Sequence, residues 1–152
     1  MQDHDEDDEL LLEFDSEASG RTAVIADEGD SVWLYLTHPT EPEIERDCWL
    51  FNLPTAAEEP DPEMYAAQSA PPPAPARFIT PEGTRRMPDA ASFRVRWSRD
   101  GHSVAVVLDG VAIGVASVEL EHGYSRYLRE AGPWGLPWDE VGVSALVNDG
   151  GA

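Results

Sequence analysis

The stretch RVRWSRDGHSVAVVLDGVAIG, Arg94 to Gly114, decides the fold class. It contains two Asp-Gly pairs, Asp100-Gly101 and Asp109-Gly110, and each stands between runs of alternating or β-branched residues. Asp-Gly is a strong hairpin signal because tight two-residue turns need positive φ. We therefore predict two successive hairpins in which these four residues serve backbone geometry rather than catalysis.

The flanking residues extend this pattern in both directions. Upstream, FRVRW at residues 93–97 alternates apolar residues with arginine, which predicts a half-buried strand with arginines on its outer face. Downstream, VAIGVASVEL follows the second turn, and Gly123 marks a further structural reversal into YSRYL. Residues 92–128 therefore predict a four-stranded antiparallel meander with short connections.

The N-terminal half carries further strand signals. TAVIADEGDSVWLYLT at residues 22–37 predicts a hairpin, and RDCWLFN at residues 46–52 predicts the next strand. Both faces of these strands are largely apolar, so we expect them to be covered on both sides. LLLEF at residues 10–14 predicts a first strand or a short amphipathic element.

A length of 152 residues indicates one domain. Residues 1–20 form an acidic segment, which we expect to be partly disordered over its first eight residues. Residues 21–140 form a single β-rich domain, and residues 141–152 form a C-terminal tail that is expected to hold a last strand and then fray. The predicted fold class is mainly β: an antiparallel meander sheet, or α+β if one short helix forms in the Pro-rich loop.

That Pro-rich loop is an insertion at residues 53–76, where seven of 24 residues are proline. Proline removes backbone donors and favours extended conformations, so we expect an exposed and flexible segment. Within it, Asp61 and Pro62 are suited to the N-cap and first position of one or two helical turns. Further along, GPWGLPWDE is expected to clamp a face or edge of the sheet.

The net charge of the chain limits the kinds of partner that it can bind. Thirty Asp and Glu stand against ten arginines, for a net charge of −20, which disfavours nucleic acid and anionic membranes. The acidic N-terminus does not resemble a signal peptide, and Cys48 is the only cysteine, so we expect a cytoplasmic protein. Three readings of the acidity stay open: composition bias of a GC-rich genome, adaptation to a halophilic host, and docking on a basic protein.

No motif for catalysis or for a cofactor stands out. The four histidines lack metal-ligand spacing, and phosphate-binding glycine loops and a hydrolase elbow are absent. Cys48 lies mid-strand, where an inert core thiol is expected. We therefore predict no enzyme, no cofactor and no metal site.

Two groups of residues are candidates for a surface that binds a partner or ligand. Arg126 beside Tyr124 and Tyr127 is the most site-like arginine, because an aromatic ring could orient its guanidinium. Trp134 and Trp138 in the tail are expected to be exposed aromatics suited to docking. A further cluster of arginines is expected to pair with the acidic N-terminal half rather than form an anion patch: Arg77, Arg85, Arg86, Arg94, Arg96 and Arg99.

Taken together, ADEGDSVWLYLT, RDCWLFN, the W-S-x-D-G turn at residues 97–101, the G-Y-x-R element at residues 123–126 and the Trp-bearing tail resemble one family. It comprises small bacterial proteins filed only as a domain of unknown function, and the likeness covers about residues 23–140. The chain departs from it in the Pro-rich insertion and at Ser125, where relatives often have Cys. The resemblance implies a compact β-rich domain and no reaction.

These observations favour a non-catalytic protein-binding domain, in its concrete form an immunity or inhibitor protein that masks a basic toxin or enzyme. The alternative from another class is a ligand-binding or enzymatic domain with a pocket between the sheet and the Trp-rich tail, where Arg126 would hold an anion. The third reading is a halophile or GC-rich-genome protein whose acidity is only adaptation.

Overall fold

The computed structural model describes the backbone of residues 11–151 and the side chains of residues 11–147. The fold is mainly β, with 40% strand and 17% helix. The N-terminal sheet is antiparallel, in the order β1 (Leu11–Asp15), β2 (Thr22–Asp27), β3 (Ser31–Thr37) and β4 (Ile44–Asn52). The C-terminal sheet has the order β5 (Phe93–Trp97), β6 (Ser103–Leu108), β7 (Val111–Ser117), β8 (Tyr124–Ser125) and β9 (Leu136–Pro137).

The predicted meander is present as β5 to β8, which pair antiparallel in sequence order. Two features were not predicted from the sequence: the strands divide into two sheets, and β9 pairs with β8 in parallel at the edge of the second sheet. The turns have the geometry expected of Asp-Gly: Asp109 and Gly110 have φ of 52° and 84°, and Gly101 has φ of 76°. Asp100 Oδ1 accepts hydrogen bonds from the His102 amide and the Ser98 hydroxyl, which fixes the first turn.

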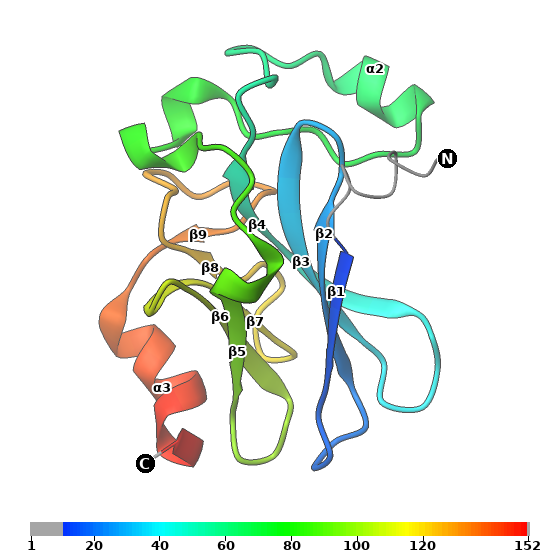
Figure 1. Cartoon of the computed structure of the whole chain (residues 1–152), viewed down its shortest axis with the longest axis vertical. Coiled ribbons are helices and arrows are strands. Elements are labelled where there is room, and N and C mark those ends of the chain that lie inside the picture. The colour runs from blue at the N-terminus through cyan, green and yellow to red at the C-terminus, as the bar shows by residue number, and fades with distance from the viewer. Residues whose placement is uncertain (1–10, 152) are drawn as a thin grey trace.

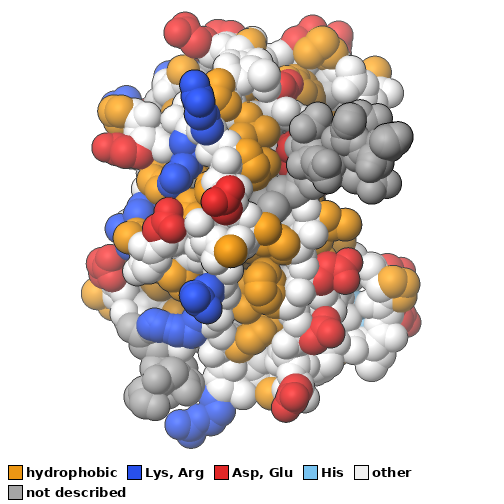
Figure 2. All heavy atoms as spheres, viewed as in Figure 1, with side chains coloured by type: hydrophobic (Ala, Val, Ile, Leu, Met, Phe, Trp, Pro, Cys, Tyr) orange, Lys and Arg blue, Asp and Glu red, His pale blue; other side chains and the backbone are white. Residues whose placement is uncertain are grey.

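The two sheets pack face to face as a wedge (Figure 1). They approach most closely where β7 meets β4, because a Cβ on Gly114 would lie 2.3 Å from Leu50 Cδ2, and glycine alone leaves that room. On the opposite side lie the edge strands β1 and β5, nearest the viewer in Figure 1. Figure 2 shows a band of hydrophobic side chains between them in its lower half, so the wedge is open on this side.

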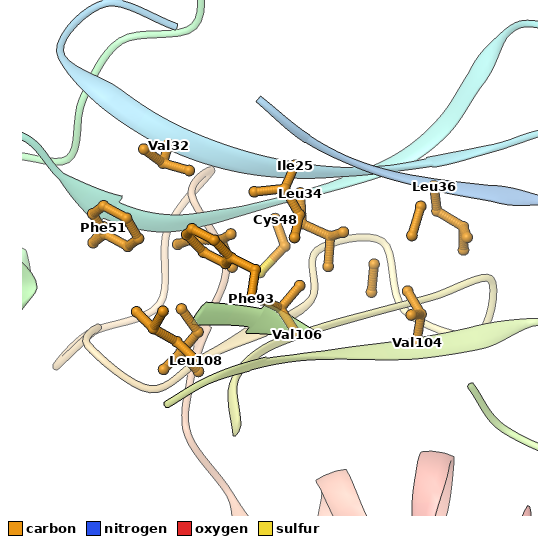
Figure 3. Packing of buried hydrophobic residues seen from close by; sticks show 14 of the residues in the cluster. Ile25, Val32, Leu34, Leu36, Cys48, Phe51, Phe93, Val104, Val106 and Leu108 are labelled. Carbon is orange, nitrogen blue, oxygen red and sulfur yellow. The ribbon is translucent and has the colours of Figure 1, made fainter. Parts of the chain in front are cut away.

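The core fills the space between the sheets. Figure 3 shows side chains of both sheets pointing toward one another: Ile25, Val32, Leu34, Leu36, Cys48 and Phe51 from the N-terminal sheet, and Phe93, Val104, Val106 and Leu108 from the C-terminal sheet. All ten are at most 4% exposed. This burial of alternate residues from two facing sheets is the main source of stability.

The C-terminal residues form helix α3 (Glu140–Gly151), so the prediction of a last strand was wrong. Val143 and Val147, one helical turn apart, pack on Ala105 and Val115 of the C-terminal sheet. This packing overrides the weak helix propensity of a segment rich in Gly, Val and Ser. The outer face of the C-terminal sheet is therefore covered by a helix.

The Pro-rich segment is packed rather than fully exposed. Helix α2 (Pro62–Ala67) forms where it was predicted, with Asp61 Oδ1 accepting from the Glu63 amide. Ala74 is fully buried and, together with Ile79 and Leu128, belongs to the buried cluster around Trp33 and Trp49 on the outer face of the N-terminal sheet. Three short 3₁₀ turns connect this segment to β5: Ala76–Phe78, Pro81–Gly83 and Ala90–Ser92.

Candidate functional site

The uncovered part of the N-terminal sheet's outer face is concave. A hollow of about 500 Å³ lies between this face and the β3–β4 loop. Its floor comes from alternate residues of β2 and β3, and its walls come from β1 and the loop. Its lining residues are Glu13, Gly20, Thr22, Val24, Tyr35, Thr37, His38, Pro39, Thr40, Glu41, Pro42 and Ile44. We call this feature the sheet hollow.

Strand register brings these residues together. Glu13 is the register partner of Val24, and Val24 is the partner of Tyr35, so the three side chains form one row across the sheet. Asp47 on β4 continues the row beyond Tyr35. Ile44, at the start of β4, is 56% exposed and presents apolar surface at the wall of the hollow. The hollow therefore combines an aromatic floor, an exposed aliphatic residue and carboxylates.

Tyr35 is fixed in the floor. Its hydroxyl donates a hydrogen bond to Glu28 Oε2, and its ring stacks against Trp33 with 6.4 Å between centroids and 9° between planes. Burial, the bond to Glu28 and the charges of Glu28 and Asp47 all raise the pKa of Tyr35. The phenol is therefore neutral at physiological pH and acts as a fixed donor.

The carboxylates of the sheet hollow are not neutralised by the arginines of the N-terminal half. Arg21 is buried and bonded to Glu45, the Thr37 carbonyl and His102. Arg46 donates to the backbone carbonyls of Val118 and Leu120. Among the described residues, Glu13 and Glu41 form no ion pair. Both carboxylates are therefore available to a cation in solution.

The two sheets differ in charge because the sequence does. Twenty of the thirty acidic residues precede residue 77, together with only two of the ten arginines. The N-terminal sheet is built entirely from that acidic half, and the C-terminal sheet and α3 come from the other half. Residues 11–52, which hold the four strands of this sheet and their turns, carry ten acidic residues and two arginines, so the N-terminal sheet is the acidic side of the described structure.

The region around Arg126 forms a second, smaller cavity, of about 140 Å³, between the C-terminal sheet and α3. The Arg126 guanidinium lies 4.3 Å from the Trp138 ring centroid, its Nε donates to the Ala112 carbonyl, and Glu140 lies 3.7 Å away. The predicted stacking of Arg126 therefore involves Trp138. Tyr124 does not line this cavity, although its ring packs in the same apolar cluster as Trp138.

The two tryptophans of the tail are half-buried, not exposed. Trp134 packs against Phe78 with ring centroids 5.2 Å apart, and its indole N–H donates to the Pro72 carbonyl. Its own carbonyl accepts from the Trp49 amide. Trp134 thus clamps the Pro-rich segment to the sheet, and Trp138 anchors α3. Neither is an open docking aromatic, which corrects that expectation.

The arginine cluster divides in two. Arg77 pairs with Glu59 at 2.6 Å, and Arg85 bonds the Tyr127 hydroxyl. Arg86, Arg94 and Arg99 form no ion pair with any carboxylate among the described residues. The expected pairing with the acidic half is therefore observed there for Arg77 alone.

Burial raises the pKa of two neighbouring groups of β4, Cys48 on the core face and Asp47 on the outer face. Cys48 is fully buried, and burial raises the pKa of its thiol to about 12, so it behaves as an inert core residue. Burial also raises the pKa of Asp47, against a smaller opposing effect of His122. Neither side chain is among those that line the sheet hollow.

Two further properties of the described residues bear on the kind of site. Within residues 11–147, no three His, Cys, Asp or Glu side chains converge as a metal site would need. No helix in the part of the chain that the structure describes is long and apolar enough to cross a membrane.

No family model, curated protein or solved structure matches this chain. The resemblance to a family of unknown function therefore stays a prediction. The sheet hollow was not predicted either, because its lining comes from four strands and the loops that join them. Its one local signal was Tyr35, which alternates with the core residues Leu34 and Leu36 of SVWLYLT and so belongs to the outer face of the strand.

Proposed function

We propose that this chain is a non-catalytic protein-binding domain, an immunity or inhibitor protein that masks a basic toxin or enzyme. The observation that carries the proposal is the sheet hollow, a concave acidic surface with aromatic and aliphatic side chains and no arginine in its lining. Concavity, unpaired carboxylates and exposed apolar area are together what a basic, protruding partner surface requires.

The mechanism has two stages. The acidic half steers a basic partner toward the N-terminal sheet, since complementary charge raises association rates above those of neutral pairs. The partner then covers Ile44 and the ring of Tyr35, while Glu13 and Glu41 meet its cations at the rim. Apolar burial and desolvated charge pairs then slow dissociation.

A capture experiment with matched variants tests this proposal. The test variant is Glu41→Arg/Glu43→Arg, which reverses Glu41 of the sheet hollow and Glu43, an exposed carboxylate of the same β3–β4 loop. The tagged chain and this variant are each used to capture partners from host lysate at rising salt. Glu82→Arg/Glu130→Arg is the control, because it makes the same charge change at two exposed positions outside the sheet hollow. We expect the wild type and the control to retain one basic protein that the Glu41/Glu43 variant loses. Equal capture by all three chains contradicts the proposal.

A second candidate function has its own observation, the cavity beside Arg126. The guanidinium stacked on Trp138 faces an apolar floor that includes Val107 and Val143. This arrangement suits a small organic anion with a short apolar tail. Isothermal titration with acetate, butyrate and phosphate tests it: saturable binding that Arg126→Gln abolishes supports this function, and no heat with any of the three rejects it.

A further inference from the structure

The open side of the wedge presents two unpaired sheet edges. Within the described residues, β1 pairs with β2 alone and β5 with β6 alone. Their core-facing side chains, Leu12 and Phe14 on β1 and Val95 and Trp97 on β5, are only half-buried. Unpaired edges beside apolar surface are sites of strand addition unless they are covered. We call this side the mouth of the wedge.

The two edge strands run in the same direction. The turn after β1 meets the turn after β5: the Ser19 hydroxyl donates to the Gly101 carbonyl at 2.8 Å, and Arg21 Nε donates to His102 Nδ1 at 2.9 Å. Because each turn follows the C-terminal end of its strand, β1 and β5 run parallel to each other, one along each border of the mouth. Each strand is five residues long.

The two edge strands that border the mouth of the wedge carry opposite charges. On the outer side of β1 stand Glu13 and Asp15, and on the outer side of β5 stand Arg94 and Arg96, all four exposed. In Figure 2 the hydrophobic band has Asp and Glu side chains on its right and arginines on its left. Arg94 forms no ion pair with any described carboxylate. The surface therefore has one acidic and one basic border around an apolar centre.

Such a surface is complementary to a second copy of itself. In a dimer whose two-fold axis runs parallel to the strands, β1 of each copy lies beside β5 of the other copy, and the two cores meet. Glu13 then lies between Arg94 and Arg96 of the other copy on the same sheet face, as cross-strand neighbours. A two-fold axis perpendicular to the sheets instead sets β1 against β1, carboxylates against carboxylates. Charge complementarity therefore selects the first arrangement.

We propose that the protein forms a homodimer through the mouth of the wedge, with β1 of each copy pairing in parallel with β5 of the other. The paired strands satisfy both open edges, and the half-buried side chains of the mouth complete a continuous core. In this dimer Glu13 pairs with the other copy, so the dimer and the basic partner proposed above would compete for Glu13. Sedimentation of the purified chain measures the dimer without that partner, so the two proposals can fail separately.

Complementary charge reversal tests the dimer. The full chain, Glu13→Arg and Arg94→Glu are each measured by sedimentation equilibrium at low salt. Both positions are exposed, so neither change should prevent folding, and circular dichroism verifies this. We expect the wild type at twice the 16.7 kDa chain mass and each single variant at the chain mass. An equimolar mixture of the two variants should return to twice the chain mass, because both Glu–Arg contacts are restored between unlike chains.

The double variant Glu13→Arg/Arg94→Glu should also dimerise, since its swapped charges meet again in the same geometry. Glu130→Arg, an exposed reversal away from the mouth, is the control and should remain dimeric. A wild type that stays at the chain mass at the highest concentration overturns the proposal. So does a dimer that both single reversals leave intact, or a mixture that stays monomeric.

Discussion

Replacing Asn52 with alanine should release the Pro-rich segment. The Asn52 side chain is 2% exposed and makes three hydrogen bonds. Its Oδ1 accepts from the Trp49 indole N–H at 2.8 Å and the Ala74 amide at 3.1 Å, and its Nδ2 donates to the Ala74 carbonyl at 2.8 Å. The Asn52 side chain thus holds the Pro-rich segment at Ala74, which is 22 residues further along the chain, over the fully buried indole of Trp49.

The magnitude follows from the groups left unpaired. Alanine removes the partner of two buried N–H groups and one buried carbonyl, and each orphaned group costs about 1–3 kcal/mol. Because local relaxation recovers part of this, we expect a loss of about 3–5 kcal/mol in the free energy of unfolding. Urea titration measures that free energy, and hydrogen exchange measures the protection of the Ala74 amide.

The control is Thr55→Ala, which removes an exposed hydrogen bond to Asp30 Oδ1 in the same segment. We expect it to cost under about 1 kcal/mol, because water replaces the lost partner. The reasoning is refuted if Asn52→Ala also costs under about 1 kcal/mol and leaves the Ala74 amide as protected as in the wild type.

Four further outcomes follow from the structure. Gly114→Ala should lower the unfolding free energy by about 1–3 kcal/mol through overpacking on Leu50, and Leu50→Val in the same chain should recover part of it in a urea titration. Burial raises the pKa of Asp47 in the folded state, so the ionised Asp47 carboxylate lowers the unfolding free energy as pH rises, and this loss vanishes below the pKa of an unfolded Asp. Asp47→Asn should therefore be more stable than the wild type at neutral pH but not in acid. The reverse order would contradict this. Cys48, with a pKa of about 12, should resist iodoacetamide at pH 8 until urea unfolds the chain, as mass spectrometry would show. The melting temperature should rise with KCl and level off near 1 M, where the Debye length is about 3 Å; a rise that continues in molar KCl would instead support halophilic adaptation.

Local signals identified most of the elements. Asp-Gly pairs need positive φ, and Asp109 and Gly110 adopt it. Asp61 caps the short helix because its carboxylate accepts from the Glu63 amide. In each case the residues that form the feature lie within three positions of one another, so the sequence alone could predict it.

The features that could not be predicted from the sequence depend on contacts between residues that lie far apart in the chain. Helix α3 is stabilised by Val143 and Val147 packing on the C-terminal sheet, not by its own propensity. Their spacing of four residues was the available signal. The Pro-rich segment is ordered by Asn52, and the sheet hollow depends on register between β1, β2 and β3. Apart from the spacing of the two valines, none of these contacts leaves a local pattern in the sequence.

The most direct test of the central claim is the association rate of this chain with the captured basic partner, measured by stopped flow across ionic strength. If the acidic sheet hollow receives the partner, the rate should fall steeply as salt rises. Glu41→Arg/Glu43→Arg should be slower at low salt with a flatter slope, while Glu82→Arg/Glu130→Arg should follow the wild type more closely. A rate that does not change with salt, or that falls equally in both variants, would contradict the claim.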